Sequence, residues 1–134
     1  MTHYRISEAA RLLGVSADTV RRWVESGSLT AARDEAGRQV IPGVDLARWA
    51  QRLAHAPEDP TGAVSSARNR FVGLVTNIVA DTVMAQVELQ CGPFRVVSLM
   101  SSEAVRDLGL EVGSTAVAVV KATTVIVEAE KHHR

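Results

Sequence analysis

The spacing of the apolar residues changes part-way along the chain, and this change constrains the fold more than any other feature. Up to residue 55 the apolar residues recur three or four positions apart, which is typical of one face of a helix. From residue 70 onward they alternate with polar residues, as in half-buried strands. The intervening residues 56–65 contain two prolines and one glycine and follow neither period, which indicates a linker. We therefore predict an α+β chain with two small domains, residues 1–55 and 66–131.

The first domain has the pattern of a winged helix-turn-helix. Ser7 is expected to cap a first short helix, Gly14 to end it in the left-handed conformation, and Ser16 to cap a second helix. Two short strands follow, joined by a turn at residues 34–37, and the segment VDLARWAQRLAH at residues 44–55 predicts a third helix. In such an arrangement the second helix is the one that enters the major groove of DNA.

The second domain has the pattern of a small β-barrel. In the segment VMAQVELQC, residues 83–91, one face is apolar and the other polar, and a further strand follows a glycine-proline turn. A short helix closed by Gly109 comes next, and residues 114–130 predict two more strands around Ala122-Thr123. Together with the strand that opens the domain, five strands and one helix indicate a small OB-like barrel.

The composition excludes several classes of protein. Apolar residues make up 46% of the chain and charged residues 22%, which is typical of a soluble globular protein and argues against disorder. The single cysteine, Cys91, allows no internal disulfide, and the sequence has no metal-ligand spacing. No apolar run approaches the ~18 residues of a membrane span, and no signal-peptide pattern precedes the first domain, so we expect a cytoplasmic protein. No nucleophile, base or phosphate-binding loop is arranged as in an enzyme, and we expect a binding protein.

Residues 3–54 resemble the DNA-binding domain of MerR-like and excisionase-like regulators. The resemblance lies in the order of elements and in the segment Thr19-Val20-Arg21-Arg22-Trp23. It implies that the second helix contacts the major groove and that the wing reaches the DNA backbone or the minor groove. The implied DNA-contacting residues are Ser16, Thr19, Arg21, Arg22, Arg33 and Arg38. Two plainer alternatives stay open: the adjacent arginines form a solvated helix face, and Ser16 acts only as a helix cap.

Residues 66–128 resemble a Mop (TOBE) domain, the molybdate-binding module. The resemblance is carried by three segments, Ser66-Ala67-Arg68-Asn69, Leu108-Gly109-Leu110-x-x-Gly113 and Val120-Lys121-Ala122-Thr123. It implies that a tetrahedral oxyanion, molybdate or tungstate, is held between subunits by backbone N–H groups, short hydroxyls and a lysine. The implied anion-binding residues are Ser66, Ala67, Arg68, Ser101, Lys121, Ala122 and Thr123. Ala104 stands where the family often has a serine, which removes one hydroxyl donor.

The chemistry of molybdate explains these residue types. Molybdate is a dianion whose oxygens accept hydrogen bonds, so a good site consists of donors only. Short side chains and backbone N–H groups place several donors around a small ion, and one lysine adds a point charge. Plainer roles remain for two of these residues. Ser101 would serve as a helix cap, and Lys121 would be an ordinary exposed lysine between strands.

Self-association is a further expectation. A barrel of about 70 residues is marginal by surface-to-volume scaling. The segment TAVAVV is apolar on both faces, which predicts burial on both sides, with a neighbouring subunit covering one of them. The resemblance implies a homo-oligomer, with a hexamer built as a trimer of dimers favoured and a dimer as the alternative.

We predict from these features a molybdate- or tungstate-responsive, DNA-binding transcriptional regulator whose anion binds at subunit interfaces. One alternative is a molybdate storage or buffering protein whose helical unit is not used for regulation. Another is an excisionase-like architectural DNA-binding protein whose barrel only oligomerises.

Overall fold

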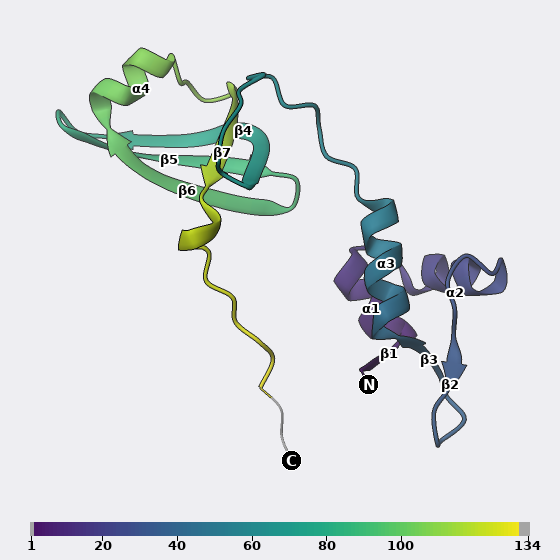
Figure 1. Cartoon of the computed structure of the whole chain (residues 1–134). Coiled ribbons are helices and arrows are strands. Elements are labelled where there is room, and N and C mark those ends of the chain that lie inside the picture. The colour runs from purple at the N-terminus through teal and green to yellow at the C-terminus, as the bar shows by residue number, and fades with distance from the viewer. Residues whose placement is uncertain (1, 132–134) are drawn as a thin grey trace. The chain divides into compact units, whose positions relative to one another are not determined.

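A computed structural model describes residues 2–131. The chain divides into two compact units, Met1–His55 and Ala56–Arg134, each with its own hydrophobic core (Figure 1). The α+β class is confirmed, since the first unit is mainly helical and the second is built on a curled antiparallel sheet. None of the helices in residues 2–131 combines the length and the apolar character that a membrane crossing requires.

The first unit contains the predicted helix-turn-helix and wing. Strand β1 pairs with β3, which also pairs with β2, so that a small antiparallel sheet with the order β1-β3-β2 forms. Strand β1 was not predicted, because three residues are too few to show a strand period. The elements are β1 (His3–Arg5), α1 (Ile6–Leu13), α2 (Ala17–Glu25), β2 (Ala32–Arg33), β3 (Gln39–Pro42) and α3 (Gly43–Leu53).

Of the three helix ends predicted for α1 and α2, two are confirmed and one is wrong. Gly14 ends α1 with a φ of 68°, and the Ser16 hydroxyl accepts a hydrogen bond from the backbone N–H of Thr19 at 3.1 Å, as predicted. The prediction for Ser7 is wrong. Helix α1 begins at Ile6 directly after β1, and the N–H of Arg5 donates instead to the Glu8 carboxylate at 3.0 Å.

The core of the first unit holds the three helices against the sheet. Val20 of α2 and Ile41 of β3 are fully buried. Trp23 of α2 and Trp49 of α3 pack edge to face, with ring centroids 5.5 Å apart. This packing fixes α2 on the rest of the unit while its outer face, which carries the predicted DNA-contacting arginines, remains exposed.

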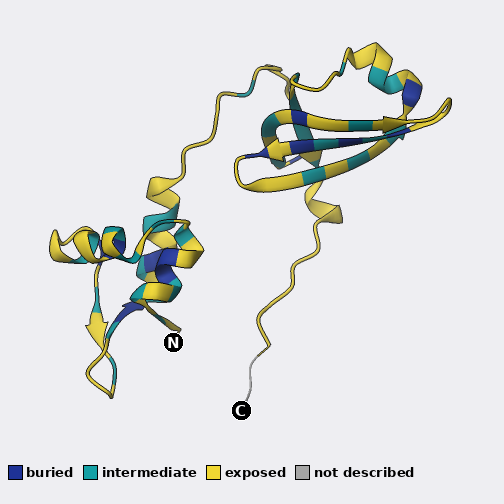
Figure 2. Ribbon diagram, turned by 180° about the vertical axis from the view of Figure 1, so that it is seen from behind, coloured by how far each residue is buried: buried dark blue, intermediate teal, exposed yellow. Residues whose placement is uncertain are grey.

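The second unit is a curled four-stranded sheet with the order β6-β5-β4-β7, all antiparallel. The predicted alternation on β5 is confirmed, because Ala85, Val87, Leu89 and Cys91 are buried. Val75, Val87, Leu89 and Cys91 form one buried cluster, and Figure 2 shows buried positions interspersed with more exposed ones along the strands. The elements are β4 (Asn69–Ala80), β5 (Met84–Cys91), β6 (Phe94–Ser101), α4 (Ser102–Leu108), β7 (Thr115–Val120) and a 3-10 turn η1 (Ala122–Thr124).

A bulge in the long strand β4 produces the curl. The pairing with β5 shifts between Val75 and Asn77, which leaves Thr76 as the extra residue. At the same point the loop before β7 joins the strand, because the N–H of Gly113 donates to Val75 O at 2.8 Å. Gly113 has a φ of 96°, a conformation that favours glycine. The first half of β4 therefore pairs with β7 and the second half with β5.

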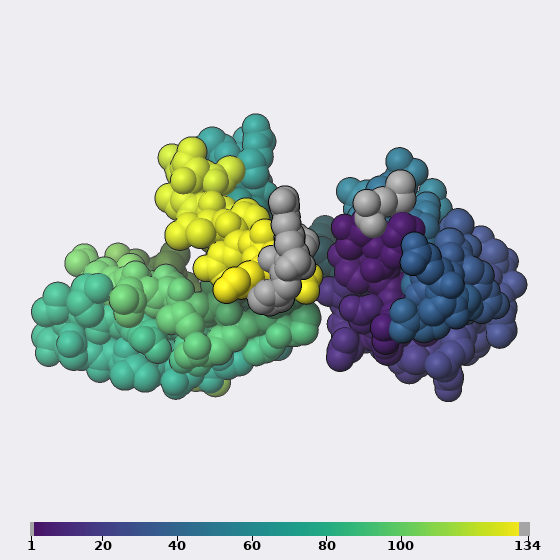
Figure 3. Space-filling model, turned by 90° about the horizontal axis from the view of Figure 1, so that it is seen from below, coloured from purple at the N-terminus to yellow at the C-terminus, as the bar shows by residue number. Residues whose placement is uncertain are grey.

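The predicted fifth strand is not formed within one chain. After η1, residues 125–131 run as exposed, unpaired backbone (Figures 1 and 3). Ile126 and Val127 are 86% and 87% exposed. The prediction of a strand here is wrong for the single chain, because the alternating residues find no partner in its sheet, and β6 and β7 remain the two open edges. Strand β7 is also only half-buried in one chain, instead of covered on both sides.

Candidate functional site

The segment before β4 forms an elbow, residues 65–68, that is pinned to the end of β7. Ala67 is buried, and its N–H donates to the Ser65 hydroxyl at 3.1 Å. Asn69 pairs with Val120, and its side-chain amide donates to Val120 O at 3.1 Å. The elbow therefore lies beside the residues that follow β7. Ser65 was not among the predicted anion-binding residues, and the structure uses its hydroxyl to hold the N–H of Ala67.

The turn after β7 presents Lys121 at this same end of the sheet. Both the backbone N–H and the hydroxyl of Thr124 donate to Lys121 O, at 3.0 and 2.9 Å, and close the turn η1. Lys121, Ala122 and Thr123 are exposed. Within residues 2–131, neither Lys121 nor Arg68 takes part in an ion pair. The end of the sheet thus combines two uncompensated cations with small, accessible backbone segments.

Ser101 lies at the opposite end of the sheet. It pairs with Met84 at the far end of β5, and its hydroxyl caps α4 by accepting from the N–H of Ala104 at 3.0 Å. A hydroxyl that accepts this bond still has its own hydrogen available to donate. The neighbouring Ser102 is buried, and its hydroxyl donates a hydrogen bond to Asp81 O at 2.8 Å. Ser101 is therefore the cap of α4, and its hydroxyl hydrogen is left available to donate.

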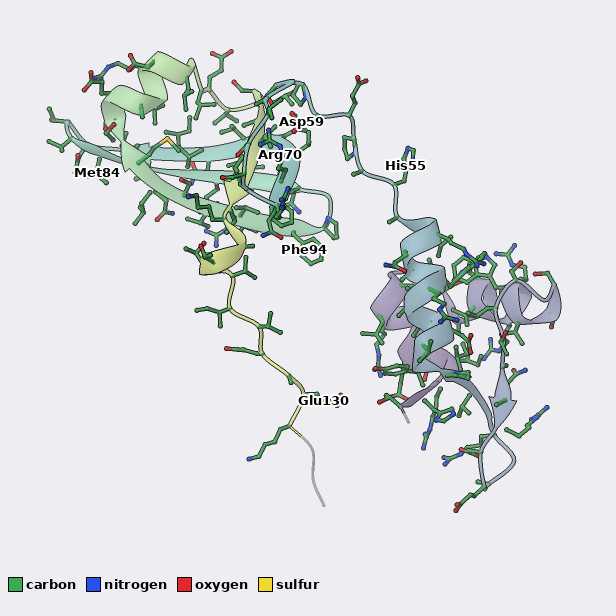
Figure 4. The ribbon with its side chains drawn as sticks, in the orientation of Figure 1. His55, Asp59, Arg70, Met84, Phe94 and Glu130 are labelled. Carbon is green, nitrogen blue, oxygen red and sulfur yellow. The ribbon has the colours of Figure 1, made fainter. Side chains whose placement is uncertain are left out.

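The predicted anion-binding residues therefore fall into two groups in one chain. Strand β4 runs from one group to the other and is roughly 35 Å long when measured along its residues. In Figure 4 the labelled residues Arg70, next to the elbow, and Met84, next to Ser101, lie at opposite ends of the sheet. One group contains Ser66, Ala67, Arg68, Lys121, Ala122 and Thr123, and the other contains Ser101 alone.

A groove of about 460 Å³ runs between the open edges β6 and β7. Its lining is mainly aliphatic and includes Val87, Leu89, Val96, Met100 and Ala118. Such a lining offers few donors to a dianion, and the groove is distinct from the elbow. The groove lies where the sheet does not close into a barrel, because β6 and β7 do not pair with each other.

Of the predicted DNA-contacting residues at α2, Ser16, Arg21 and Arg22 are exposed and Thr19 is half-buried. The Arg21 guanidinium pairs with the Asp18 carboxylate at 2.7 Å, and Arg22 donates to the Thr19 hydroxyl at 3.2 Å. The Ser16 and Thr19 hydroxyls are 2.9 Å apart and hydrogen bonded. Exposed pairs of this kind contribute little to stability.

The wing arginines are held on a rigid hairpin tip. Asp34 accepts the N–H groups of Ala36 and Arg38 and the Arg38 Nε, the last at 3.0 Å. These bonds, led by the Arg38 N–H, hold the pKa of Asp34 below its usual value. The Arg33 guanidinium donates to Gly37 O at 2.9 Å across the same tip. Both arginines are exposed, so the wing presents two cations next to its turn.

In comparisons with known proteins, each of the two units matches a different family model. Residues 4–54 match a family model described as a helix-turn-helix domain, and residues 65–127 match the TOBE domain. A probable molybdenum-pterin-binding protein of Haemophilus influenzae is 44% identical over 66 residues, which is 48% of this chain and 96% of that protein. Molybdenum-pterin-binding protein 3 of Clostridium pasteurianum is 37% identical over 63 residues, which is 46% of this chain and 93% of that protein.

Among solved structures, a molybdate binding protein from Sporomusa ovata is 33% identical to this chain. The match covers 50% of this chain and 100% of that one, with a TM-score of 0.48. The relatives thus correspond to about half of this chain.

Proposed function

Because the chain belongs to the family of the molybdenum-pterin-binding (Mop) proteins through its TOBE domain, and joins that domain to a helix-turn-helix, we propose that it is a molybdate-responsive DNA-binding transcriptional regulator. The observation that carries the proposal is the presence of both modules on one chain of 134 residues. Neither module is enzymatic, so the proposed activity is binding alone.

Molybdate is the proposed ligand of the elbow and the Lys121 turn. Support comes from the exposed side chains of Lys121 and Arg68, which form no ion pair within residues 2–131 and lie beside short backbone segments. Ser66, Ala122 and Thr123 would add N–H and hydroxyl donors. Tungstate has the same charge and nearly the same size, and we expect it to bind comparably. Sulfate has the same charge but is smaller, so the size of the assembled site would set the discrimination.

We further propose that the site is completed between subunits of a homo-oligomer. In one chain Ser101 lies a strand length away from Lys121, so both could contact one anion only if they came from different copies. The open β6–β7 groove and the exposed apolar residues 125–127 supply complementary surfaces for such an assembly. A hexamer built as a trimer of dimers is the favoured assembly, and a dimer is the smaller alternative.

In this proposal the anion controls DNA binding through the assembly. One helix-turn-helix unit makes few phosphate contacts, and affinity for DNA grows with their number, so tight binding requires at least two units. An anion shared between subunits stabilises one arrangement of the barrels and thereby the arrangement of the attached units. A coupling free energy of ~1–3 kcal/mol is enough for regulation.

Storage or buffering of molybdate is the second candidate function. It is favoured by the ion pairs Arg21–Asp18 and Arg38–Asp34, which already engage two of the four candidate arginines within the chain. The two functions differ in one observable, the binding of DNA.

The discriminating experiment is a gel retardation assay with DNA from upstream of the protein's own coding region. The wild type is compared with Arg22→Ala, which removes an exposed guanidinium that forms no ion pair within residues 2–131. The regulator proposal expects retardation by the wild type that the variant weakens. Absence of retardation with and without molybdate would favour storage.

A further inference from the structure

The linker between the two domains is fastened to the barrel by a single side-chain cluster. The Asp59 carboxylate accepts the Arg70 Nε at 2.8 Å and both the N–H and the hydroxyl of Thr61, at 2.9 and 2.7 Å. Arg70 also donates to the Thr61 hydroxyl at 2.9 Å. Figure 4 shows Asp59 and Arg70 next to each other at the start of β4. We name the residues Asp59, Thr61 and Arg70 the linker latch.

The three side chains of the latch are hydrogen bonded to one another. The Thr61 hydroxyl donates to Asp59 and accepts from both Arg70 and the N–H of Ala63, which fills its one donor and two acceptor positions. The Arg70 and Asp59 side chains are 23% and 33% exposed, so both partners are sheltered, whereas each of the other three ion pairs in residues 2–131 has one partner at least half exposed. Hydrogen bonds from Arg70 first, and then from Thr61, lower the pKa of Asp59 to about 2.

The two ends of the latch, Asp59 and Arg70, lie on either side of the elbow in the sequence. The Asp59–Arg70 pair closes residues 59–70 into a loop, and the elbow lies inside this loop. On its other side the elbow is fixed by the bond from Asn69 to Val120, immediately before Lys121. The elbow is thus held from both ends, once by the latch and once by the strand that leads to the lysine.

We propose that the linker latch is a positioning device that holds the elbow in the geometry needed to bind the oxyanion together with Lys121, and that shortens the tether to the helix-turn-helix unit. The proposal rests on the proposed molybdate site. With the latch closed, the free tether is about five residues, between Leu53 and Asp59, and spans roughly 20 Å at most. With it open, the tether extends to the elbow and spans roughly 40 Å. The segment that contacts the anion therefore also sets how far the DNA-contacting unit can reach.

The test uses the full-length protein and three variants. Asp59→Asn removes the charge of the latch but touches no proposed anion ligand. The charge-swapped double variant Asp59→Arg, Arg70→Asp restores an ion pair of opposite polarity. Glu88→Gln is the matched control, because it removes the Glu88–Arg95 ion pair of the same unit on β5 and β6.

Two quantities are measured for each protein: the molybdate dissociation constant by calorimetry, and amide hydrogen exchange of residues 56–68 by mass spectrometry. We expect Asp59→Asn to weaken molybdate binding on the order of tenfold, as loss of a group that orients a ligand residue does in metal sites. We also expect faster exchange of residues 56–68 in the absence of molybdate. The double variant should recover part of both effects, and Glu88→Gln should leave both unchanged.

The outcomes separate this proposal from the proposed function. Unchanged molybdate affinity in Asp59→Asn, in a wild type that binds molybdate, would overturn the positioning role while the anion site stands. Failure of the wild type to bind molybdate would contradict the anion site itself and the positioning role with it. Unchanged hydrogen exchange in Asp59→Asn would show that the linker is not held by the latch.

Discussion

At the scale of single residues, the proposed anion site depends on two cations without carboxylate partners in the described part of the chain. Lys121 follows β7 directly, and Arg68 lies one residue before β4. Apart from Ala67, whose N–H donates to the Ser65 hydroxyl, the proposed neighbours of the anion offer donors, and a lysine adds attraction as a compact point charge. The Asp59 carboxylate, which lies at the start of β4, forms an ion pair with Arg70. The local field therefore favours an anion.

Replacing Lys121 tests this charge directly. Lys121→Ala should weaken molybdate binding by roughly ten- to a hundredfold, because a charge-assisted hydrogen bond is worth about 1.5–3 kcal/mol. Calorimetric titration with molybdate measures the change. Lys131→Ala is the matched control, since it removes an exposed lysine outside the proposed site. Equal affinities in all three proteins would exclude Lys121 as a ligand.

The lowered pKa of Asp59 predicts how the stability of the protein changes with pH. Its pKa is lowered to about 2 in the folded protein, so its ion pair stabilises the fold at neutral pH and at mildly acidic pH. This contribution is lost as the pH falls toward 2, because protonation then favours the unfolded chain. Urea unfolding of the wild type and Asp59→Asn between pH 2 and pH 7 measures it. The stability difference between the two proteins should shrink as the pH falls; a constant difference would contradict the assignment.

At the scale of elements, the curled sheet depends on a close approach between β4 and β5. A Cβ at Gly73 would lie 2.5 Å from Gln90 O and 2.6 Å from Cys91 Sγ. Strand β4 can therefore pair with β7 through its first half and cross β5 only if position 73 lacks a side chain. The bulge at Thr76 then turns the second half of β4 toward β5.

Gly73→Ala should therefore destabilise the barrel unit by about 1–3 kcal/mol, the usual cost of overpacking a core. Far-ultraviolet circular dichroism during urea unfolding measures the sheet. Trp23 and Trp49 both lie in the first unit, so their fluorescence provides an internal control for that unit. A sheet transition at the same urea concentration as in the wild type would contradict the close approach.

The elements differ in how far the sequence predicts them. Helices α2 and α4 and strand β5 were predicted because local signals set them: the cap at Ser16, the glycine at 109 and the alternation along β5. The segment 125–131 alternates like a strand, yet it pairs with no strand of its own sheet, and a local pattern does not reveal whether a partner strand is present. The cluster of Asp59, Thr61 and Arg70 depends on a linker that folds back on the barrel, and linker composition does not encode that contact.

The proposed anion site was likewise only partly predictable from the sequence. Its residues were implied by the resemblance to Mop domains, whereas periodicity alone indicated only a small barrel. The structure adds that Lys121 and the elbow share one end of the sheet and that Ser101 occupies the other. Long-range register sets this separation, so it could not be predicted from the spacing of the residues.

At the scale of the whole molecule, assembly is the property on which the proposed regulation depends. One chain leaves the groove between β6 and β7 open and three apolar residues, 125–127, exposed. These two surfaces are expected to cover each other between copies, because open sheet edges and an exposed apolar segment both favour pairing with a further strand. The predicted oligomer follows from this match.

A chain that ends at Thr124 should therefore form a smaller assembly than the full-length protein. Light scattering coupled to size-exclusion chromatography measures the mass. Leu12→Ser serves as the control, since it removes an exposed apolar side chain from the first unit instead. A truncated protein with the same number of subunits as the wild type would show that residues 125–134 do not hold the assembly together.

The most direct test of the account is the affinity of the full-length protein for its upstream DNA, measured by fluorescence anisotropy with and without saturating molybdate. Sulfate at the same ionic strength and the Lys121→Ala variant are the controls. The account predicts that molybdate changes the DNA dissociation constant by at least about fivefold, that sulfate does not, and that Lys121→Ala abolishes the effect. Identical DNA affinity with and without molybdate, in a protein that binds both, would contradict the regulatory coupling.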